Sequence, residues 1–269
     1  ETESWNNLSD EQKKIDAREM ETYAAMVDNM DYHIGRVLNY LDASGQRDNT
    51  IVIFISDNGA QGFGPGMARA FPQDWIDENF DTSFENIGKI NSYAYLGPHW
   101  ARASTAPMRM FKGFSSDGGL KVPAIISYPG KLEARAGTFT NQLTTVLDLP
   151  ATFLDIAKTK HPGTSYKGRQ VHPYTGVSLL PFLNGESEII HEPDDVVGWE
   201  LNNSRAVRKG DWKIILLPGR FGTGDWELFN IKNDPAERTD LSEAEPEKRS
   251  EMIAEWEKYA RNNGVIIAE

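Results

Sequence analysis

Oxygen-bearing side chains follow an apolar run in the first quarter of the chain. The run Ile51–Ile55 has the β-branched composition of a buried strand, and Ser56–Gly59 (SDNG) follows it directly. Asp57 and Asn58 therefore place a carboxylate and an amide oxygen side by side where the strand ends. Such oxygens are the ligands that hard cations prefer. We predict that this pair forms half of a metal site.

A lysine precedes the second apolar run. Lys112 opens a Gly-rich turn (KGFSSDGGLKVP) that leads into Ala124–Tyr128. Ligands of open α/β sheets collect beyond the carboxyl ends of strands, so an oxygen pair after one strand and a lysine before another can converge on an anionic substrate. Taken alone, Asp-Asn-Gly is also an ordinary turn, and most lysines are simply exposed.

Composition limits the class of protein. The chain has 269 residues, enough for one large domain or two small ones, with 39% hydrophobic and 25% charged residues. Its 28 Lys and Arg residues against 40 Asp and Glu residues give a net charge of −12, which disfavours nucleic acid as a partner. The absence of cysteine excludes disulfides, thiolate metal ligands and a cysteine nucleophile within this sequence. No apolar run reaches the roughly 18 residues of a membrane span, so we expect none.

Hydrophobic periodicity predicts an α/β arrangement. A capping box at Ser9–Gln12 precedes apolar residues spaced by three and four, which predicts a long amphipathic helix that ends near Gly45. Strands are predicted at residues 50–56 and 124–128. Residues 144–156 (TTVLDLPATFLDI) predict an extended entry followed by a helix with proline near its first turn.

More than fifty residues rich in glycine, asparagine and aromatic side chains separate Asn58 from Lys112. Connections of this length usually build a functional surface, so we interpret the segment as the wall or lid of a cleft. The alternative is a partly helical excursion whose aromatic side chains pack on the body of the protein.

The last third of the chain predicts a small antiparallel sheet covered by one helix. Four short alternating runs separated by turn signals are Val196–Glu200, Ser204–Arg208, Lys213–Leu217 and Glu227–Ile231. A hairpin is predicted at Lys209–Asp211, and a helix begins at Pro246 and ends near Gly264. We therefore expect two domains, residues 1–185 and 186–269.

Four stretches together resemble the type I sulfatases of the alkaline phosphatase superfamily, bacterial arylsulfatases in particular. They are Phe54–Gly59, Lys112 with Asp117–Ala124 (DGGLKVPA), Val146–Leu154, and the tail segments Arg205–Lys213, Glu227–Ile231 and Asp234–Leu241. Each is weak alone, but their order and spacing are specific. The resemblance implies a large mixed sheet flanked by helices and a C-terminal subdomain with a four-stranded antiparallel sheet and one helix. It leaves the bacterial cytoplasm and the periplasm open as compartments.

The resemblance also implies a chemistry. In the family, a Cys or Ser in a Cys/Ser-x-Pro-x-Arg motif becomes formylglycine, whose hydrate attacks the sulfur of a sulfate ester above a calcium or magnesium ion. This sequence has no such motif; residues 105–109 (TAPMR) are a near miss that we interpret as structural. Because the sequence begins at Glu1, we expect the formylglycine and further ligands in a missing N-terminal half of the same protein, whose absence leaves apolar surface exposed.

Site residues follow from the matched motifs. Asp57 and Asn58 match metal ligands of the family, and Lys112 matches the lysine that contacts the sulfate and its bridging oxygen. His99 in the aromatic segment can exchange protons near neutral pH, and we assign it either a substrate contact or a structural role. The remaining histidines are interpreted as surface or packing residues: His33, His161, His172 and His191.

Three functions remain open at this point. The first is an arylsulfatase that hydrolyses small-molecule sulfate esters, with this segment inactive by itself and binding calcium weakly. The second is a phosphodiesterase or phosphonate monoester hydrolase on the same scaffold. The third is a catalytically silent module that binds a partner.

Overall fold

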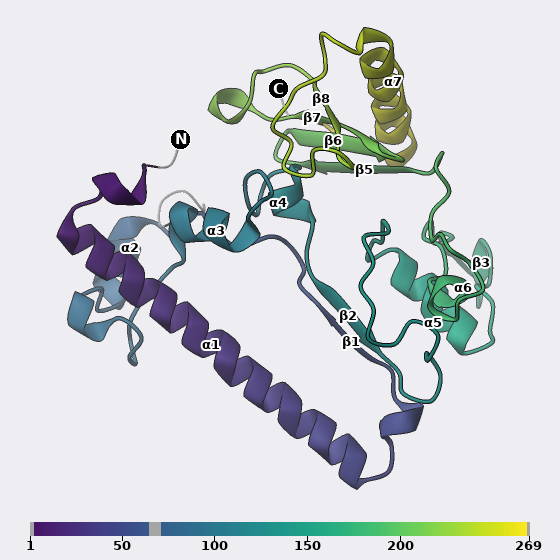
Figure 1. Cartoon of the computed structure of the whole chain (residues 1–269), viewed down its shortest axis with the longest axis horizontal. Helices are drawn as coiled ribbons and strands as arrows, with labels where there is room; N and C mark the ends of the chain where they lie inside the picture. Colours follow the sequence, from purple (N-terminus) through teal and green to yellow (C-terminus); the bar gives the residue numbers. More distant parts are fainter. Residues whose placement is uncertain (1–2, 65–70, 268–269) are drawn as a thin grey trace. The chain divides into compact units, whose positions relative to one another are not determined.

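The computed structural model of the chain describes residues 3–64 and 71–267 (Figure 1). It divides into two compact units. The first comprises residues 1–40, 54–125 and 196–269, and the second comprises residues 41–53 and 126–195. Both units are discontinuous in sequence. The predicted domain boundary between residues 185 and 186 stays a prediction.

Helices and strands alternate in the first part of the chain, and strands dominate after residue 195. The helices are α1 (Asp10–Ala43), α2 (Gln73–Asn79), α3 (Gly97–Thr105), α4 (Asp117–Leu120), α5 (Asp148–Ile156), α6 (Leu180–Leu183) and α7 (Pro246–Asn263). The strands are β1 (Val52–Ile55), β2 (Ala124–Ser127), β3 (Ser165–Tyr166), β4 (Arg169–Gln170), β5 (Val196–Leu201), β6 (Ser204–Lys209), β7 (Trp212–Leu216) and β8 (Glu227–Asn230). Short 3-10 helices lie at Trp5–Asn7, Arg47–Asn49, Phe84–Asn86 and Gly219–Phe221. The predicted α/β class is confirmed.

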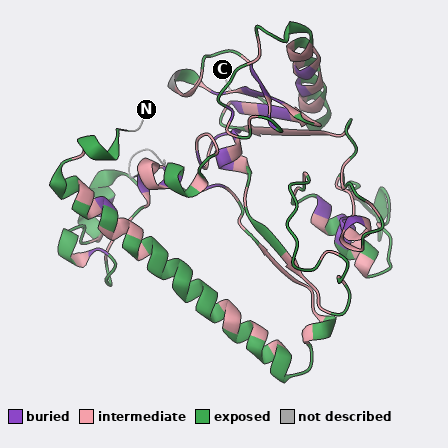
Figure 2. Ribbon diagram, in the orientation of Figure 1, coloured by how far each residue is buried: buried purple, intermediate pink, exposed green. Residues whose placement is uncertain are grey.

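The long helix α1 begins where the capping box predicts. The hydroxyl of Ser9 accepts a hydrogen bond from the backbone N–H of Gln12 at 3.1 Å, which satisfies one of the free N–H groups of the first turn. Most of α1 is exposed (Figure 2), and its exposed residues include apolar ones, with Met26 and Tyr40 both 67% exposed. The expectation of exposed apolar surface is therefore confirmed for this helix.

The first two strands lie where the apolar runs predict them, but they are not buried. Among the described residues, β1 and β2 form a two-stranded sheet, so neither has a second neighbour. Ile55 is 40% exposed and Ile125 is 61% exposed. The prediction of a buried strand before Asp57 is thus wrong for this chain, because burial of a strand requires neighbours and covering layers that the described residues do not supply.

The segment between Asn58 and Lys112 is partly helical, as the second predicted alternative has it; residues 65–70 lie outside the described residues. It contains α2, α3 and the 3-10 turn between them. Its aromatic rings pack on one another: Trp75 lies 5.1 Å from Phe71 and 5.8 Å from Phe80, measured between centroids. A role as the wall or lid of a cleft stays a prediction.

The C-terminal sheet has the order β5-β6-β7-β8 with all pairs antiparallel. The predicted hairpin is present: the turn Gly210-Asp211 joins β6 to β7, and Lys209 pairs with Trp212 across it. Helix α7 lies along this sheet in Figure 1 and ends at Gly264, whose φ of 64° is the left-handed conformation of a helix C-cap.

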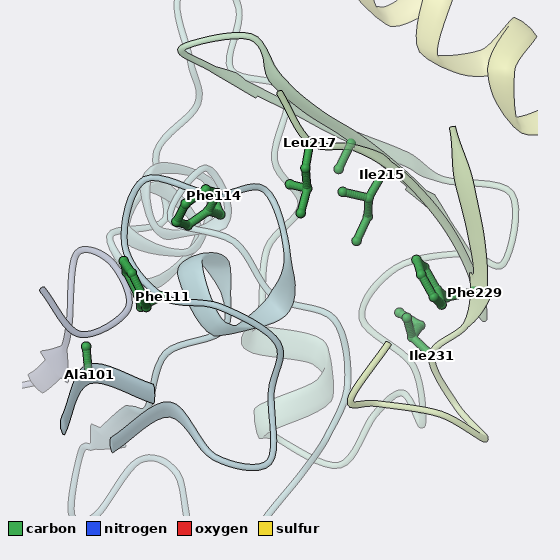
Figure 3. Packing of buried hydrophobic residues seen from close by; sticks show 8 residues of the cluster. Ala101, Phe111, Phe114, Ile215, Leu217, Phe229 and Ile231 are labelled. Atoms are coloured by element: carbon green, nitrogen blue, oxygen red, sulfur yellow. The ribbon is translucent and has the colours of Figure 1, made fainter. Parts of the chain in front are cut away.

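Alternating residues of this sheet build two hydrophobic cores on opposite faces. One core joins strand residues to Met252 and Trp256 of α7; its strand residues are Val207, Ile214 and Leu228. The other joins strand residues to Ala101 of α3 and to a loop that carries two phenylalanines; its members are Ala101, Phe111, Phe114, Ala206, Ile215, Leu217, Phe229 and Ile231 (Figure 3). The sheet is therefore a platform with a helix on one face and the Lys112 loop on the other.

In the second unit, a buried carboxylate organises the start of α5. Asp148 is fully buried and accepts hydrogen bonds from the backbone N–H groups of Thr145 at 2.6 Å and Val177 at 2.9 Å. The ring of His191 lies 3.1 Å from the same carboxylate and 3.2 Å from that of Asp195. Asp148 is also the first residue of α5, where a carboxylate is favourable at the helix N-terminus.

Candidate functional site

The side chains of Asp57 and Asn58 lie together at the end of β1. The amide Nδ2 of Asn58 donates to Oδ1 of Asp57 at 3.0 Å and to the carbonyl of Gly59 at 3.3 Å. The hydroxyl of Ser56 donates to the carbonyl of Asn58 at 2.9 Å, which closes a tight turn. Asp57 is exposed and Asn58 is half-buried. The turn therefore presents a carboxylate to solvent beside an amide.

Three backbone hydrogen bonds join this turn to the Lys112 loop. Ser56 donates to Pro123 at 3.4 Å, Gly59 donates to Gly119 at 3.0 Å, and Lys112 donates to Ala60 at 3.0 Å. The predicted convergence of the two segments is thus observed in the backbone.

These bonds limit the separation of the predicted site residues. Because hydrogen-bonded segments lie about 5 Å apart and two residues of chain span at most about 7 Å, the Cα atom of Asn58 lies within about 12 Å of that of Lys112. Contact of both segments with one tetrahedral oxyanion stays a prediction.

Glycine is required where the two segments touch. A Cβ atom on Gly59 would lie 1.8 Å from the carbonyl oxygen of Gly118, and one on Gly118 would lie 2.2 Å from the carbonyl oxygen of Met110. Both distances are far below van der Waals contact. The glycines of DNG and DGG therefore serve the close approach of the turn to the loop.

The ammonium group of Lys112 is available to a ligand. Lys112 is half-buried, and within the described part of the chain its Nζ makes no hydrogen bond or ion pair. Its neighbour Gly113 has φ 94°, and a Cβ there would lie 2.5 Å from the ring of Phe63. The backbone beside the lysine is therefore fixed by packing, while its charge has no partner among residues 3–64 and 71–267.

Asp57 and Asn58 carry the type of oxygen ligand that a hard cation prefers, but two ligands are too few to bind one. A carboxylate and an amide oxygen are ligands that Ca²⁺ and Mg²⁺ prefer, yet Ca²⁺ takes six to eight oxygens. No group of three or more His, Cys, Asp or Glu side chains suited to a metal occurs among residues 3–64 and 71–267. The pair can therefore form only part of a metal site.

A buried ion cluster, not predicted from the sequence, supports the Lys112 loop. Lys213 of β7 is fully buried, and its ammonium contacts Asp117 and lies 2.7 Å from Oε1 of Glu237. Both carboxylate oxygens of Glu237 also accept the backbone N–H of Asp117 at 3.2 Å. The only sequence signal was a lysine at an inward position of an otherwise apolar strand.

Lys213 and Asp117 each stabilise the charged form of the other. Burial alone would lower the pKa of Lys213, but Glu237 and Asp117 outweigh it and raise that pKa. Burial would raise the pKa of Asp117, yet the Lys213 ammonium holds it below its usual range. Burial raises the pKa of Glu237, with Lys213 opposing and Asp117 adding to the rise. Lys213 and Asp117 therefore form a buried ion pair at neutral pH.

Two further contacts clamp the same loop to the C-terminal sheet. Ser115 donates its backbone N–H to the hydroxyl of Ser204 at 2.7 Å and its own hydroxyl to the Ser204 carbonyl at 2.8 Å. Arg109 binds both carboxylate oxygens of Glu227 at 3.2 and 3.3 Å.

Residues 105–109 thus have a structural role in this fold. The hydroxyl of Thr105 donates to the carbonyls of Ala101 at 3.0 Å and Met110 at 2.9 Å, at the end of α3. Arg109, as described above, pairs with Glu227. The structural interpretation of this near-miss motif is supported.

His99 lies in α3 and lines a hollow of about 410 Å³ with Trp5, Trp100 and Ala103. Its Nε2 atom is buried without a hydrogen-bond partner among the described residues. The rings of Trp5 and Trp100 pack with their centroids 5.5 Å apart, and the indole N–H of Trp100 donates to the backbone carbonyl of Asp16. A substrate contact by His99 stays a prediction.

The other histidines differ in their surroundings. His33 and His172 are exposed, and His161 packs edge-on against Tyr174. His191 is the exception, because it joins the Asp148 and Asp195 network. Sequence reasoning gave no sign of that network.

Comparisons with known proteins identify the family. The chain matches the model "Sulfatase" over residues 2–159 and the model "N-sulphoglucosamine sulphohydrolase, C-terminal" over residues 109–261. It is 40% identical over 271 residues to an uncharacterized sulfatase of Schizosaccharomyces pombe; the match covers 99% of this chain and 48% of that relative. It is 37% identical over 179 residues to the arylsulfatase of Klebsiella aerogenes, over 65% of this chain and 37% of the relative. The chain belongs to the sulfatase family.

Solved structures agree on the fold. The structure of Ps i-CgsB in complex with k-i-k-neocarrahexaose superposes with a TM-score of 0.60 at 24% identity, over 95% of this chain and 44% of that one. Phosphonate monoester hydrolase of Agrobacterium radiobacter gives a TM-score of 0.52 at 17% identity, over 90% of this chain and 40% of that one. The predicted alkaline-phosphatase-like fold is confirmed. The chain spans less than half the length of these proteins and of the two relatives above.

No described helix combines the length and apolar character needed to cross a bilayer.

Proposed function

We propose that this chain contributes two metal ligands and one sulfate contact to an arylsulfatase, an enzyme that hydrolyses an aryl sulfate to a phenol and sulfate. The observation that carries the proposal is the hydrogen-bonded approach of the Asp57–Asn58 turn to the loop of Lys112. Membership of the sulfatase family and 37% identity to the Klebsiella aerogenes arylsulfatase support it.

Each residue has a separate role in this proposal. Asp57 and Asn58 hold a calcium ion, or magnesium in its place, together with ligands from outside the described residues. The bound ion supplies Lewis-acid chemistry at the sulfate oxygens. Lys112 brings a positive charge to the sulfate group and its bridging oxygen, which stabilises negative charge as the alcohol departs.

The nucleophile lies outside this chain in the proposal. The sequence has no cysteine and no Ser-x-Pro-x-Arg motif, so the formylglycine of the family has no precursor here. We therefore expect the chain alone to show no turnover and to bind calcium weakly. Calorimetric detection of one tight calcium site in the isolated chain would contradict this.

The test uses the complete protein and a chromogenic aryl sulfate. We expect Asp57→Ala and Lys112→Ala each to lower kcat/KM by about 10²–10³, the usual cost of removing one electrostatic contact to the reacting group. Asp28→Ala and Lys131→Ala are matched controls, because both side chains are exposed and lie outside the turn and the loop. Full turnover by Asp57→Ala would refute the assignment.

Side-by-side kinetics separate the alternatives. Aryl sulfate, phosphate diester and phosphonate monoester substrates are compared under the same conditions. A higher kcat/KM for the phosphorus esters would replace the sulfatase with a phosphodiesterase or phosphonate monoester hydrolase. No turnover of any of them would favour a silent binding module.

A further inference from the structure

Lys213 and Glu237 are far in sequence from the candidate site but close to it in structure. Lys213 lies on the face of β7 that packs on the Lys112 loop, and Glu237 follows β8. Both side chains are buried, with relative exposures of 1% and 0%. Their hydrogen bonds to the loop are made with Asp117, not with Asp57, Asn58 or Lys112, so we expect any effect on those three to pass through the backbone.

Two hydrogen-bonded contacts and a short stretch of backbone connect the cluster to the Asp57–Asn58 turn. The Lys213 ammonium contacts the carboxylate of Asp117, whose backbone N–H is bound by Glu237. Two residues further along the chain, the carbonyl of Gly119 accepts the N–H of Gly59 at 3.0 Å. Gly59 directly follows Asn58, so the path from the cluster to this turn is short.

A backbone hydrogen bond next to Asp117 closes the loop. Gly118 donates its N–H to the carbonyl of Arg109 at 2.9 Å, so residues 109–118 form a closed loop that includes Lys112. The positive φ angles of Met110 and Gly113, 63° and 94°, show that residues 110–113 depart from helix and strand geometry. Such a backbone persists only where its surroundings determine it.

We infer that Lys213 and Glu237 are positioning residues of the candidate site: by fixing the Asp117–Gly119 turn, they hold the Asp57–Asn58 pair and Lys112 at the separation that one oxyanion requires. The inference rests on the proposed function for its catalytic consequence. Its structural part, the fixing of the turn, stands independently.

The physical reason is the cost of an incomplete cluster. Removing the ammonium removes the donor that bridges the carboxyl groups of Asp117 and Glu237. Arg208 and Lys121 still act on Asp117, but two buried carboxyl groups then lie close together without the group that pairs them, which is costly. The Asp117–Gly119 turn is then expected to move away from the sheet, and the Gly59–Gly119 hydrogen bond with it. Misplacement of about 1 Å is enough to lower catalysis by about 10².

The test compares three substitutions in the complete protein. Lys213→Met removes the ammonium. Ile214→Val shortens the side chain of the adjacent residue on the same strand. That side chain packs in the core on the other face of the sheet, against α7. Lys209→Met removes a lysine of the same sheet that pairs with Glu251 and Glu255 of α7 instead of the loop. Thermal unfolding identifies conditions where all three are folded.

Hydrogen exchange provides a measure that does not depend on activity. We expect the amides of Gly59 and Lys112 to exchange at least 10-fold faster in Lys213→Met and at the original rate in the other two. Equal exchange rates in Lys213→Met and Ile214→Val would overturn the inference, whatever the enzyme hydrolyses. Failure of the proposed function would show separately, as absent aryl sulfate turnover by the unmodified protein.

Activity and metal dependence complete the test. In Lys213→Met, kcat/KM for the aryl sulfate is expected to fall about 10²-fold, and the calcium concentration for half-maximal activity to rise at least 10-fold. Both controls should keep the original calcium dependence. An unchanged calcium dependence in Lys213→Met would show that Asp57 and Asn58 do not rely on the cluster, and would also overturn the inference.

A milder substitution covers the case in which Lys213→Met does not fold. Glu237→Gln keeps the size of the side chain and one acceptor oxygen but removes its charge and one acceptor. We expect the same direction of change at Gly59, with exchange about 3-fold to 10-fold faster. Unchanged exchange at Gly59 in Glu237→Gln would contradict the role assigned to Glu237.

Discussion

The Asp148 network offers a sharp test of how one carboxylate organises the second unit. The substitution is Asp148→Asn, which keeps the shape of the side chain and replaces one acceptor oxygen by an NH₂ donor. In the protein, Oδ1 accepts the N–H of Val177, and Oδ2 accepts the N–H and the hydroxyl of Thr145 and lies 3.1 Å from Nε2 of His191. The amide nitrogen therefore faces hydrogen-bond donors in either orientation.

The magnitude follows from these contacts. With its oxygen in the Oδ2 position, the amide leaves the Val177 N–H without an acceptor; with its oxygen in the other position, it leaves the Thr145 N–H without one. An unsatisfied buried donor costs about 1–3 kcal/mol, and the remaining bonds lose their charge assistance. We expect a loss of about 3 kcal/mol in the free energy of unfolding.

Asp195→Asn is the matched control, because the same imidazole ring contacts this second carboxylate. Its side chain is 42% exposed, so water can replace its contacts, and we expect a loss below about 1 kcal/mol. Thermal unfolding measures both variants, and hydrogen exchange at the Val177 amide reports the local change. Equal losses for the two substitutions would refute the reasoning, since burial of Asp148 would then have no energetic consequence.

Two further predictions concern the first unit. Gly59→Ala should lower the free energy of unfolding by about 2–3 kcal/mol and reduce activity, because its Cβ would lie 1.8 Å from the Gly118 oxygen. Gly35→Ala is the control: a Cβ at this position of α1 meets no atom within 4 Å, so the substitution should stabilise the protein by up to about 1 kcal/mol. Thermal unfolding compares the two variants. Burial and the Asp16 carboxylate raise the pKa of Glu19 from 4.5 to about 7, so the folded state loses stability as pH rises from about 4.5 to 7. Glu19→Gln should therefore gain about 1 kcal/mol at pH 8, after allowance for solvent screening, and nothing at pH 4; equal gains at both pH values would contradict the assigned pKa.

Local patterns predicted the elements of this protein well. The capping box at Ser9 marks the start of α1, and the two-residue hairpin after Lys209 joins β6 to β7. The left-handed Gly264 ends α7. These features depend on neighbouring residues in the sequence, so their physical causes lie within the window that periodicity and capping describe.

Burial could not be predicted in the same way. The run Ile51–Ile55 has the composition of a buried strand, yet Ile55 is 40% exposed in this chain. Composition reports what a segment can bury, whereas the number of neighbouring strands and covering helices decides what it does bury. The exposed apolar side chains of α1 follow the same rule.

The sequence by itself determined the long first helix, the strands before Asp57 and after Lys112, the C-terminal sheet with its helix, the family resemblance and the candidate residues Asp57, Asn58 and Lys112; it did not predict β3, β4, α4 or α6. Only the tertiary structure showed that three backbone hydrogen bonds join their segments, and that Lys213 and Glu237 support the loop between them. Lys213 lies 96 residues from Asp117, and no local periodicity encodes a contact over that separation. Such contacts are decided by the packing of the sheet against the loop, because a buried charge can exist only where the fold brings its counter-charges together.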